Sequence, residues 1–299
     1  MVSSARPTFS VIIPTYNRPL QLGACLAALA KQNLPAGFEV IVVDDGGDYD
    51  IDAVIGAWRQ RLEVRCLRMA NCGPSAARNH GAAAAKGAWL AFTDDDCEAA
   101  PEWLAALEAA LENSPGALVG GRTVNALENN ICAAASQLIQ DLAYRYYNSG
   151  PAGPSFFAAN NLAVPAEDFL RLGGFDSSFR TAEDRDLCDR WRLSGRPLVY
   201  APKAVVRHRR PMRLGEFWRQ HVGYGRGARR FQLAHQRRDQ SSSTIRPDFY
   251  LWALRTLPRL LQDQPKRLRI LALLAVWQAA NTTGFLLEVL RKESRHAAE

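Results

Sequence analysis

The first half of the chain alternates strand-like and helix-like segments at the spacing of βαβ units, and this feature most constrains its fold. The segments with strand character are 9–14, 39–44, 64–68, 89–93 and 118–122. The segments with helical periodicity are 20–31, 51–60, 75–86 and 101–112. The pattern predicts an α/β fold with a mostly parallel, Rossmann-like central sheet flanked by helices.

The pattern loosens after Arg122. We expect a helix over 129–149, short strands over 155–159 and 162–164, a helix over 183–194 and two strands over 197–201 and 204–207. From Arg213 onward the chain is basic and helical. Two domains are therefore predicted: residues 1–210, and a basic helical region over 211–299.

Composition places the chain among globular proteins, with 47% hydrophobic and 22% charged residues. Its six cysteines form no C-x-x-C pair, which argues against a zinc ribbon or a disulfide framework and favours a reducing compartment, the cytoplasm. Residues 203–299 hold 20 Lys and Arg against 7 Asp and Glu, whereas the first 202 residues are net acidic. This asymmetry predicts an acidic catalytic part and a basic part that meets phosphates of lipid, nucleotide or nucleic acid.

Polar residues follow three of the predicted strands: 15–17, 44–47 and 94–96. Ligands of open α/β sheets bind outside the carboxyl ends of the strands, so the three tips predict one binding crevice. The run Asp94-Asp95-Asp96 is the strongest signal, because adjacent carboxylates repel each other unless a cation neutralises them. Oxygen ligands favour Mg²⁺ or Mn²⁺. The alternative is a solvated acidic loop that caps the next helix.

A second acidic cluster, Glu183-Asp184-Arg185-Asp186, opens a predicted helix. The helix macrodipole alone would favour these carboxylates, but one of them could also serve as a general base toward an acceptor hydroxyl. His208 follows the last predicted strand and could ligate a metal or contact a phosphate, although a structural histidine is the ordinary alternative.

Together these motifs resemble the family 2 glycosyltransferases, nucleotide-sugar enzymes of the GT-A fold, over residues 9 to about 210. The motifs that carry the resemblance are 10–18 (SVIIPTYNR), 39–46 (EVIVVDDG), 73–81 (GPSAARNHG), 94–96 (DDD), and 173–176 (GGFD) followed by Glu183-Asp184. In this order and spacing they are very specific.

The resemblance implies a role for each matching residue. A nucleotide pocket would be lined by Pro14, Thr15, Tyr16, Asn17, Arg18, Asp45, Arg78, Asn79, Asp94 and Asp95. Asp94 and Asp96 match the outer positions of the D-x-D motif. Asp96 would be the direct ligand of Mn²⁺ or Mg²⁺, and Asp94 would lie at the metal or contact the ribose. His208 would add a metal or phosphate contact. Asp184 matches the catalytic base, with Glu183 beside it as the alternative.

The implied reaction is a single inverting displacement that moves a sugar from a nucleotide-diphosphate sugar to an acceptor hydroxyl. The resemblance favours UDP, with GDP and dTDP open. The Gln-x-x-Arg-Trp motif of processive members is missing, and the stretch 216–227 reads EFWRQHVGYGRG, so we expect one sugar to be added per acceptor. A nucleotidyltransferase is disfavoured because 14–19 lacks glycine. A nucleic-acid-binding protein would explain the basic C-terminal third but not the acidic strand tips, and intact Asp96 and Asp184 argue against a non-catalytic nucleotide-binding protein.

The basic C-terminal region interleaves arginine with tryptophan and leucine over 249–261 and 268–290. This composition favours an anionic membrane surface over nucleic acid as partner, although a helical pair covering the domain's own core is the alternative. We expect a peripheral enzyme on the inner face of the cell membrane, acting on a lipid-linked or envelope glycan.

Overall fold

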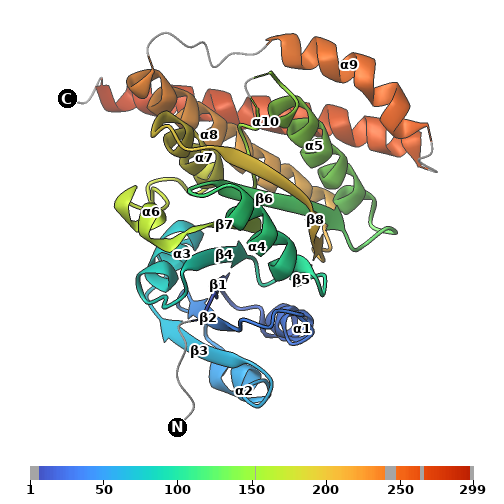
Figure 1. Ribbon diagram of the computed structural model, residues 1–299. Coiled ribbons are helices and arrows are strands. Elements are labelled where there is room, and N and C mark those ends of the chain that lie inside the picture. The colour runs from blue at the N-terminus through green and yellow to red at the C-terminus, as the bar shows by residue number, and fades with distance from the viewer. Residues whose placement is uncertain (1–6, 152, 240–246, 263–265, 297–299) are drawn as a thin grey trace. The chain divides into compact units, whose positions relative to one another are not determined.

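The computed structural model describes residues 7–151, 153–239, 247–262 and 266–296 (Figure 1). These residues form two compact units. The first consists of 7–126, 153–178 and 183–209, and the second of 127–151, 179–182 and the described residues from Arg210 onward.

The first unit is built on one eight-stranded sheet with the order β3-β2-β1-β4-β7-β6-β8-β5. The strands are β1 (Phe9–Thr15), β2 (Phe38–Asp44), β3 (Glu63–Arg68), β4 (Trp89–Thr93), β5 (Cys97–Ala99), β6 (Leu118–Asn125), β7 (Asn161–Pro165) and β8 (Leu198–His208). Parallel pairing joins β3, β2, β1 and β4, and also β6 and β8. Strand β7 runs antiparallel to both β4 and β6, and β5 runs antiparallel to β8. The prediction of an α/β fold with a central sheet flanked by helices is confirmed.

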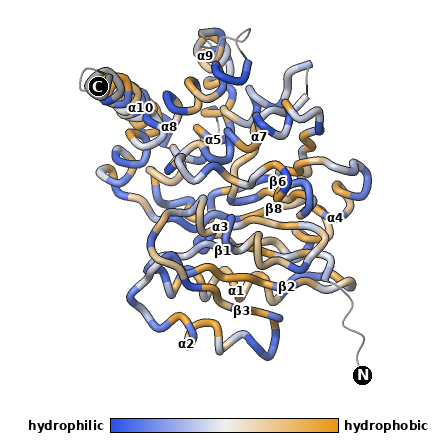
Figure 2. Tube along the Cα trace, turned by 90° about the vertical axis from the view of Figure 1, so that its left-hand side faces the viewer, coloured by the Kyte–Doolittle hydropathy of each residue, from blue (hydrophilic) through white to orange (hydrophobic). Residues whose placement is uncertain are grey.

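Side chains of β1 alternate between the two faces of the sheet. Val11 and Ile13 belong to the core beneath the helices α1 (Pro19–Leu29), α2 (Ile51–Gly56) and α4 (Trp103–Asn113). Ile12 points to the other face, where α3 (Pro74–Ala83) approaches so closely that a Cβ on Gly81 would lie 2.7 Å from Ile12 Cγ2. Figure 2 shows hydrophobic residues gathered at β2, whose residues 39–44 are all buried.

The helices α6 (Ala166–Arg171) and α7 (Glu183–Leu193) complete the first unit. Phe169 of α6 packs against Phe92 of β4, with ring centroids 5.1 Å apart. Helix α7 carries the second acidic cluster at its N-terminal turn, as the sequence predicted.

Two strand predictions differ from the structure. Residues 155–159 form no strand, and the two strands predicted over 197–201 and 204–207 are one strand, β8. The register explains the predicted break, because Gly121 of β6 faces Ala201 whereas Arg122 faces Val205. The residues between Ala201 and Val205 bulge out of the ladder, and the strand continues beyond them.

The second unit is helical and contains α5 (Ile131–Asn148), α8 (Leu214–Arg238), α9 (Pro247–Leu261) and α10 (Arg267–His296). Leu138, Phe217 and Leu273 belong to its hydrophobic core. Helices α8 and α10 cross at glycines: a Cβ on Gly225 would lie 2.0 Å from Asn281 O, and one on Gly284 would lie 1.9 Å from Val222 O. The basic helical extension predicted from Arg213 is therefore built around a close crossing of two helices.

Candidate functional site

The carboxyl ends of β1, β2 and β4 lie side by side because these strands are parallel neighbours. The loop after β1 contacts the acidic run after β4: Thr15 Oγ1 donates a hydrogen bond to Asp95 Oδ2 over 2.8 Å. Arg18 Nη1 lies 3.0 Å from Asp95 Oδ1 and 3.1 Å from Asp96 Oδ2. Two of the three predicted strand tips therefore meet through side chains.

Each carboxylate of the acidic run is bound by at least one arginine, and Asp95 and Asp96 share Arg18. Asp94 Oδ1 accepts from Arg78 Nη2 over 2.6 Å, and Asp95 is held by Thr15 and Arg18. Burial, together with the neighbouring carboxylates of Asp96 and Asp94, raises the pKa of Asp95 to about 6, although Arg18 opposes the shift. The run is thus partly buried and cross-linked, unlike a solvated loop that merely caps a helix.

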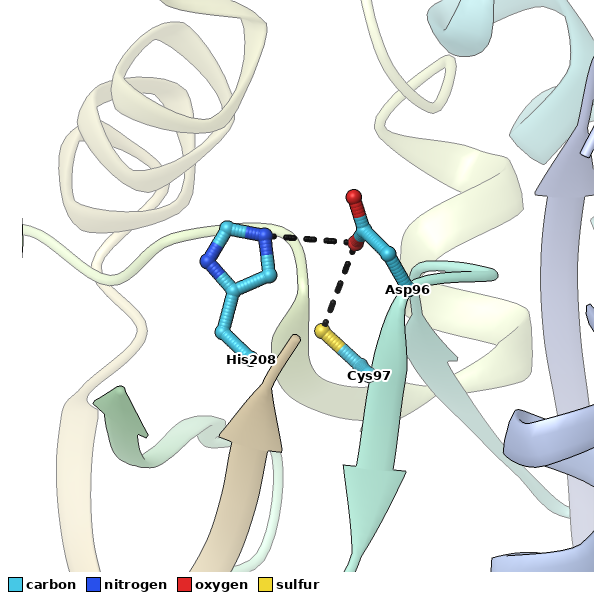
Figure 3. Close-up of side chains that lie close together, drawn as sticks. All are labelled: Asp96, Cys97 and His208. Carbon is cyan, nitrogen blue, oxygen red and sulfur yellow. Dashed lines mark hydrogen bonds and ion pairs between the residues drawn. The ribbon is translucent and has the colours of Figure 1, made fainter. Parts of the chain in front are cut away.

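His208 reaches Asp96 because β5 pairs with β8. In the antiparallel register Cys97 faces His208, and His208 Nε2 lies 3.2 Å from Asp96 Oδ1. Cys97 Sγ lies 3.9 Å from the same oxygen (Figure 3). Arg18 occupies the other oxygen, Oδ2, so Oδ1 of Asp96 faces the nitrogen and the sulfur.

These donors fit a divalent cation. Ligand atoms of Asp96, Cys97 and His208 all lie within 4.8 Å of one another. Carboxylate oxygen is a preferred ligand of Mn²⁺ and Mg²⁺, and imidazole nitrogen is a common ligand of first-row transition metals. Asp94 lies outside this group and binds Arg78 instead, so its role as a metal ligand stays a prediction.

Arg78 joins the two acidic clusters. Its side chain is 4% exposed, with Nη2 on Asp94 and Nη1 3.0 Å from Glu183 Oε1. The guanidinium also lies over the ring of Phe175, 5.5 Å from its centroid. The run after β4 and the N-terminus of α7 are therefore bridged by one buried cation, although Asp94 and Glu183 lie 89 positions apart in the sequence.

Asp184 lies next to Glu183 but is held differently. Its carboxylate accepts from the backbone N–H of Arg185 over 2.7 Å and from that of Ala159 over 3.4 Å. Burial and the adjacent Glu183 raise the pKa of Asp184 to about 7. A carboxylate that exchanges its proton near neutral pH is suited to general base catalysis.

Three of the residues predicted to line the nucleotide pocket make side-chain hydrogen bonds to the backbone of neighbouring turns. Asp45 accepts from the N–H groups of Cys72 and Gly73 and so fixes the turn before α3. Asn79 exchanges two hydrogen bonds with the backbone of Phe175, at 2.7 and 2.9 Å. Asn17, at a φ of 54°, accepts from the N–H of Asp48. Pro14 lies within β1 and is buried, whereas Tyr16, directly after β1, is 46% exposed.

Sequence reasoning missed Cys97 as a member of the metal group. It also missed the three-residue strand β5 that carries Cys97 and sets it opposite His208. The available signal was the position of Cys97 directly after the acidic run, but a lone cysteine at such a place is most often core.

The sheet and its flanking helices define the class of glycosyltransferases with a GT-A fold. Solved structures of this class share the fold. A mannosyltransferase from Pyrobaculum calidifontis, in complex with GDP-Man and Mn²⁺, is similar with a TM-score of 0.65 and 18% identity over 97% of this chain and 87% of that one. TarS 1–349 of S. aureus is similar with a TM-score of 0.53, 19% identity and coverage of 96% of this chain and 92% of that one.

The protein belongs to glycosyl transferase family 2, whose sequence profile matches residues 10–163. It is 30% identical to the validoxylamine A glucosyltransferase of Streptomyces hygroscopicus subsp. limoneus, over 64% of this chain and 49% of that protein. It is also 30% identical to the pre-mycofactocin glycosyltransferase of Mycobacterium tuberculosis, over 76% of this chain and 48% of that protein. The chain spans about half the length of these relatives.

Proposed function

We propose that this glycosyltransferase moves a single sugar from a nucleotide-diphosphate sugar to an acceptor hydroxyl, with inversion at the anomeric carbon and with Mn²⁺ or Mg²⁺ bound. The observation that carries the proposal is the bridge made by Arg78 between Asp94 of the metal-side run and Glu183 beside Asp184. It ties the residues suited to hold a diphosphate and its metal to a carboxylate suited to take a proton.

Asp184, rather than Glu183, is the base in this proposal. Glu183 is ion-paired with Arg78, whereas the hydrogen bonds of the Asp184 carboxylate come from backbone N–H groups. A pKa near 7 lets Asp184 accept the proton of an acceptor hydroxyl at neutral pH and release it after transfer. One base acting on the attacking hydroxyl corresponds to a single displacement, which inverts the configuration.

Asp96 and His208 would hold the divalent cation, which when bound offsets the charge that develops on the leaving diphosphate. Arg18 binds Oδ2 of Asp96 and so holds that carboxylate with Oδ1 toward His208. Asp94 would contact the ribose. The loop 14–18 and the buried Asp95 would line the nucleotide pocket. There, Arg78 could release the carboxylate of Asp94 and bind a phosphate of the nucleotide instead.

UDP is the proposed nucleotide, with GDP and dTDP as the alternatives. Among the structural neighbours the mannosyltransferase holds GDP-Man, and TarS 1–349 has been solved with UDP, so the fold itself accepts both bases. The acceptor is proposed to be a lipid-linked or envelope glycan that receives one sugar, since the processive motif is missing from the sequence.

Calorimetric titration of UDP, GDP and dTDP in the presence of Mn²⁺, with and without EDTA, tests the donor side. We expect one nucleotide to bind only with metal, and Asp96→Ala to lose that binding. Asp52→Ala is the matched control, because Asp52 is a half-exposed carboxylate paired with Arg68. Equal nucleotide binding by wild type and Asp96→Ala would contradict the assignment of the metal site.

We also propose that the second unit lies on an anionic membrane. Helix α10 presents an apolar stripe to solvent, and Leu268 in it is 76% exposed. The stripe, which recurs at helical spacing, consists of Leu268, Leu271, Ala275, Ala279, Leu286 and Leu290. Exposed basic residues flank it, namely Lys266, Arg267, Arg269 and Arg291. An exposed apolar face with a basic rim is complementary to an anionic lipid surface.

Helix α10 from Arg267 to Arg291 is long and apolar enough to cross a membrane, by its length and composition alone. Its opposite face is packed against α8 at Gly284 and Gly225. A helix that is covered on one side favours a position in the membrane interface over an isolated crossing.

Sedimentation with vesicles tests whether the apolar stripe of α10 binds lipid. We expect binding to vesicles that contain anionic lipid, weakened by salt and by the double change Leu268→Glu with Leu271→Glu. Leu20→Glu, at an 86% exposed leucine of α1, is the control and should bind as wild type does. Vesicle binding that the stripe substitutions leave unchanged would refute the proposed membrane face.

A further inference from the structure

The group around Asp96 contains a sulfur donor that a magnesium or manganese site does not need. Cys97 is fully buried, yet its Sγ faces the same Asp96 oxygen as His208 Nε2 does (Figure 3). Magnesium and manganese prefer oxygen, whereas a thiolate beside an imidazole and a carboxylate is a donor set for zinc, cobalt or cadmium. The side chain at position 97 therefore bears on which cation the site prefers.

The two distances that join Asp96 Oδ1 to the other donor atoms are close to those of a tetrahedral site. Metal–ligand lengths of about 2.3 Å for sulfur and about 2.1 Å for nitrogen and oxygen place the sulfur and oxygen ligands about 3.6 Å apart, and nitrogen and oxygen about 3.4 Å apart. The corresponding distances are 3.9 Å from Cys97 Sγ to Asp96 Oδ1 and 3.2 Å from His208 Nε2 to that oxygen. Cys97 Sγ and His208 Nε2 lie within 4.8 Å of each other, against about 3.6 Å in a tetrahedral site, so side-chain rotation would bring them together when a cation binds.

The backbone holds the three donors in place. Cys97 and His208 face each other in the β5–β8 ladder, and the N–H of Arg209 donates to Asp96 O over 2.7 Å. Arg18 holds the second oxygen of Asp96. Three protein ligands on a fixed frame leave the fourth tetrahedral position for water or a phosphate oxygen, which is the arrangement of catalytic zinc sites.

We propose that Cys97 is a third ligand of this centre, and that it makes the site bind the borderline-soft cations Zn²⁺, Co²⁺ and Cd²⁺ more tightly than an oxygen and nitrogen site would. The inference rests on the proposed metal role of Asp96 and His208. When the cation binds, the metal–sulfur bond forms, the S–H bond breaks and the proton passes to solvent. Zinc then competes with Mn²⁺ for the site.

Cobalt is the probe that reports sulfur directly. Co²⁺ titrated into the reduced full-length protein is expected to give visible ligand-field bands, together with a thiolate-to-cobalt charge-transfer band in the near ultraviolet. Cys97→Ser should abolish the charge-transfer band and weaken Zn²⁺ binding about tenfold or more, while Mn²⁺ affinity changes much less. Cys25→Ser, which alters another buried thiol, is the control and should keep the band.

X-ray absorption spectroscopy at the zinc edge, on the wild-type protein loaded with Zn²⁺, provides a test that does not depend on the folding of a variant. It should report one sulfur neighbour at about 2.3 Å. Cobalt bands without the charge-transfer band, or a zinc shell of oxygen and nitrogen alone, would overturn the role of Cys97 and leave the proposed transferase site standing. If Co²⁺ binds neither to the wild-type protein nor to Asp96→Ala, both the role of Cys97 and the proposed metal site of the transferase would be overturned.

Discussion

Replacing Asp184 by Asn should abolish transfer and, at the same time, stabilise the protein. Asp184 has its pKa raised from 3.8 to about 7 by burial and by Glu183. The folded protein therefore holds a proton on this side chain over a pH range in which the unfolded chain has released it. Because the folded state binds more protons there, the free energy of unfolding falls as the pH rises from about 4 to about 7.

The magnitude follows from the shift. About 3 pH units correspond to about 4 kcal/mol at pH 8, where Asp184 is ionised in both states. An asparagine at this position carries no charge, so the cost of ionising the buried side chain is removed. Its N–H₂ group, however, faces one of the backbone N–H donors of Arg185 and Ala159 and cannot accept from it, which costs about 2 kcal/mol. The net gain is about 2 kcal/mol, which raises Tm by about 3–5 °C for a protein of this size.

Thermal unfolding at pH 8 and at pH 5, with identical scan rates, checks this reasoning. The gain in Tm should be present at pH 8 and nearly vanish at pH 5, where the folded wild type is already protonated at Asp184. Glu183→Gln is the matched neighbour and should lower Tm, because it leaves the buried Arg78 with one carboxylate fewer. A gain that is equal at both pH values, or none at pH 8, would refute the argument. Sugar transfer by Asp184→Asn at a rate near that of wild type would remove Asp184 from the role of base.

Other substitutions test the frame of the site. Arg18→Ala should lower the unfolding free energy of the metal-free protein by about 1–2 kcal/mol, because it strips the buried Asp95 carboxylate of its cation, and Mn²⁺ should raise Tm more in the variant than in wild type. Equal shifts with Mn²⁺ would argue against metal at the acidic run. Gly120→Ala should cost about 3 kcal/mol or more, since its Cβ would lie 1.9 Å from Phe157 Cγ. Gly23→Ala, in open space on α1, should instead be neutral or stabilising by up to about 1 kcal/mol. Similar denaturant midpoints for the two glycine variants would contradict the packing around Phe157.

Local periodicity was sufficient for the βα units of the first half. Strands β1, β2 and β4 are runs of mostly buried residues, and each strand from β1 to β4 was predicted to within one residue at either end. It failed where a strand is defined only by its partner. Residues 97–99 are too short to show any period, and the break predicted after Ala201 is a bulge whose far side is paired with β6.

The site followed the same division. The carboxylates of 94–96 and Asp184 were found because they stand at the ends of recognisable elements. The bridge by Arg78 between Asp94 and Glu183 joins residues far apart in the sequence, and no motif predicts an ion pair across that distance. Asp45 and Asn79 were assigned to the nucleotide from their motifs, whereas in the structure they also satisfy backbone N–H and carbonyl groups of neighbouring turns.

The short strand β5 lies at the outer edge of the sheet and is joined to it only through β8. Edge strands of three residues open easily, because few backbone hydrogen bonds must break. A cation held by Asp96 before β5 and by His208 at the end of β8 would link these two strands at the edge of the sheet. Its binding free energy would then also oppose fraying, so amide hydrogen exchange at Ala100, whose N–H donates to Val205 O, and at Arg209, whose N–H donates to Asp96 O, should slow when metal is added.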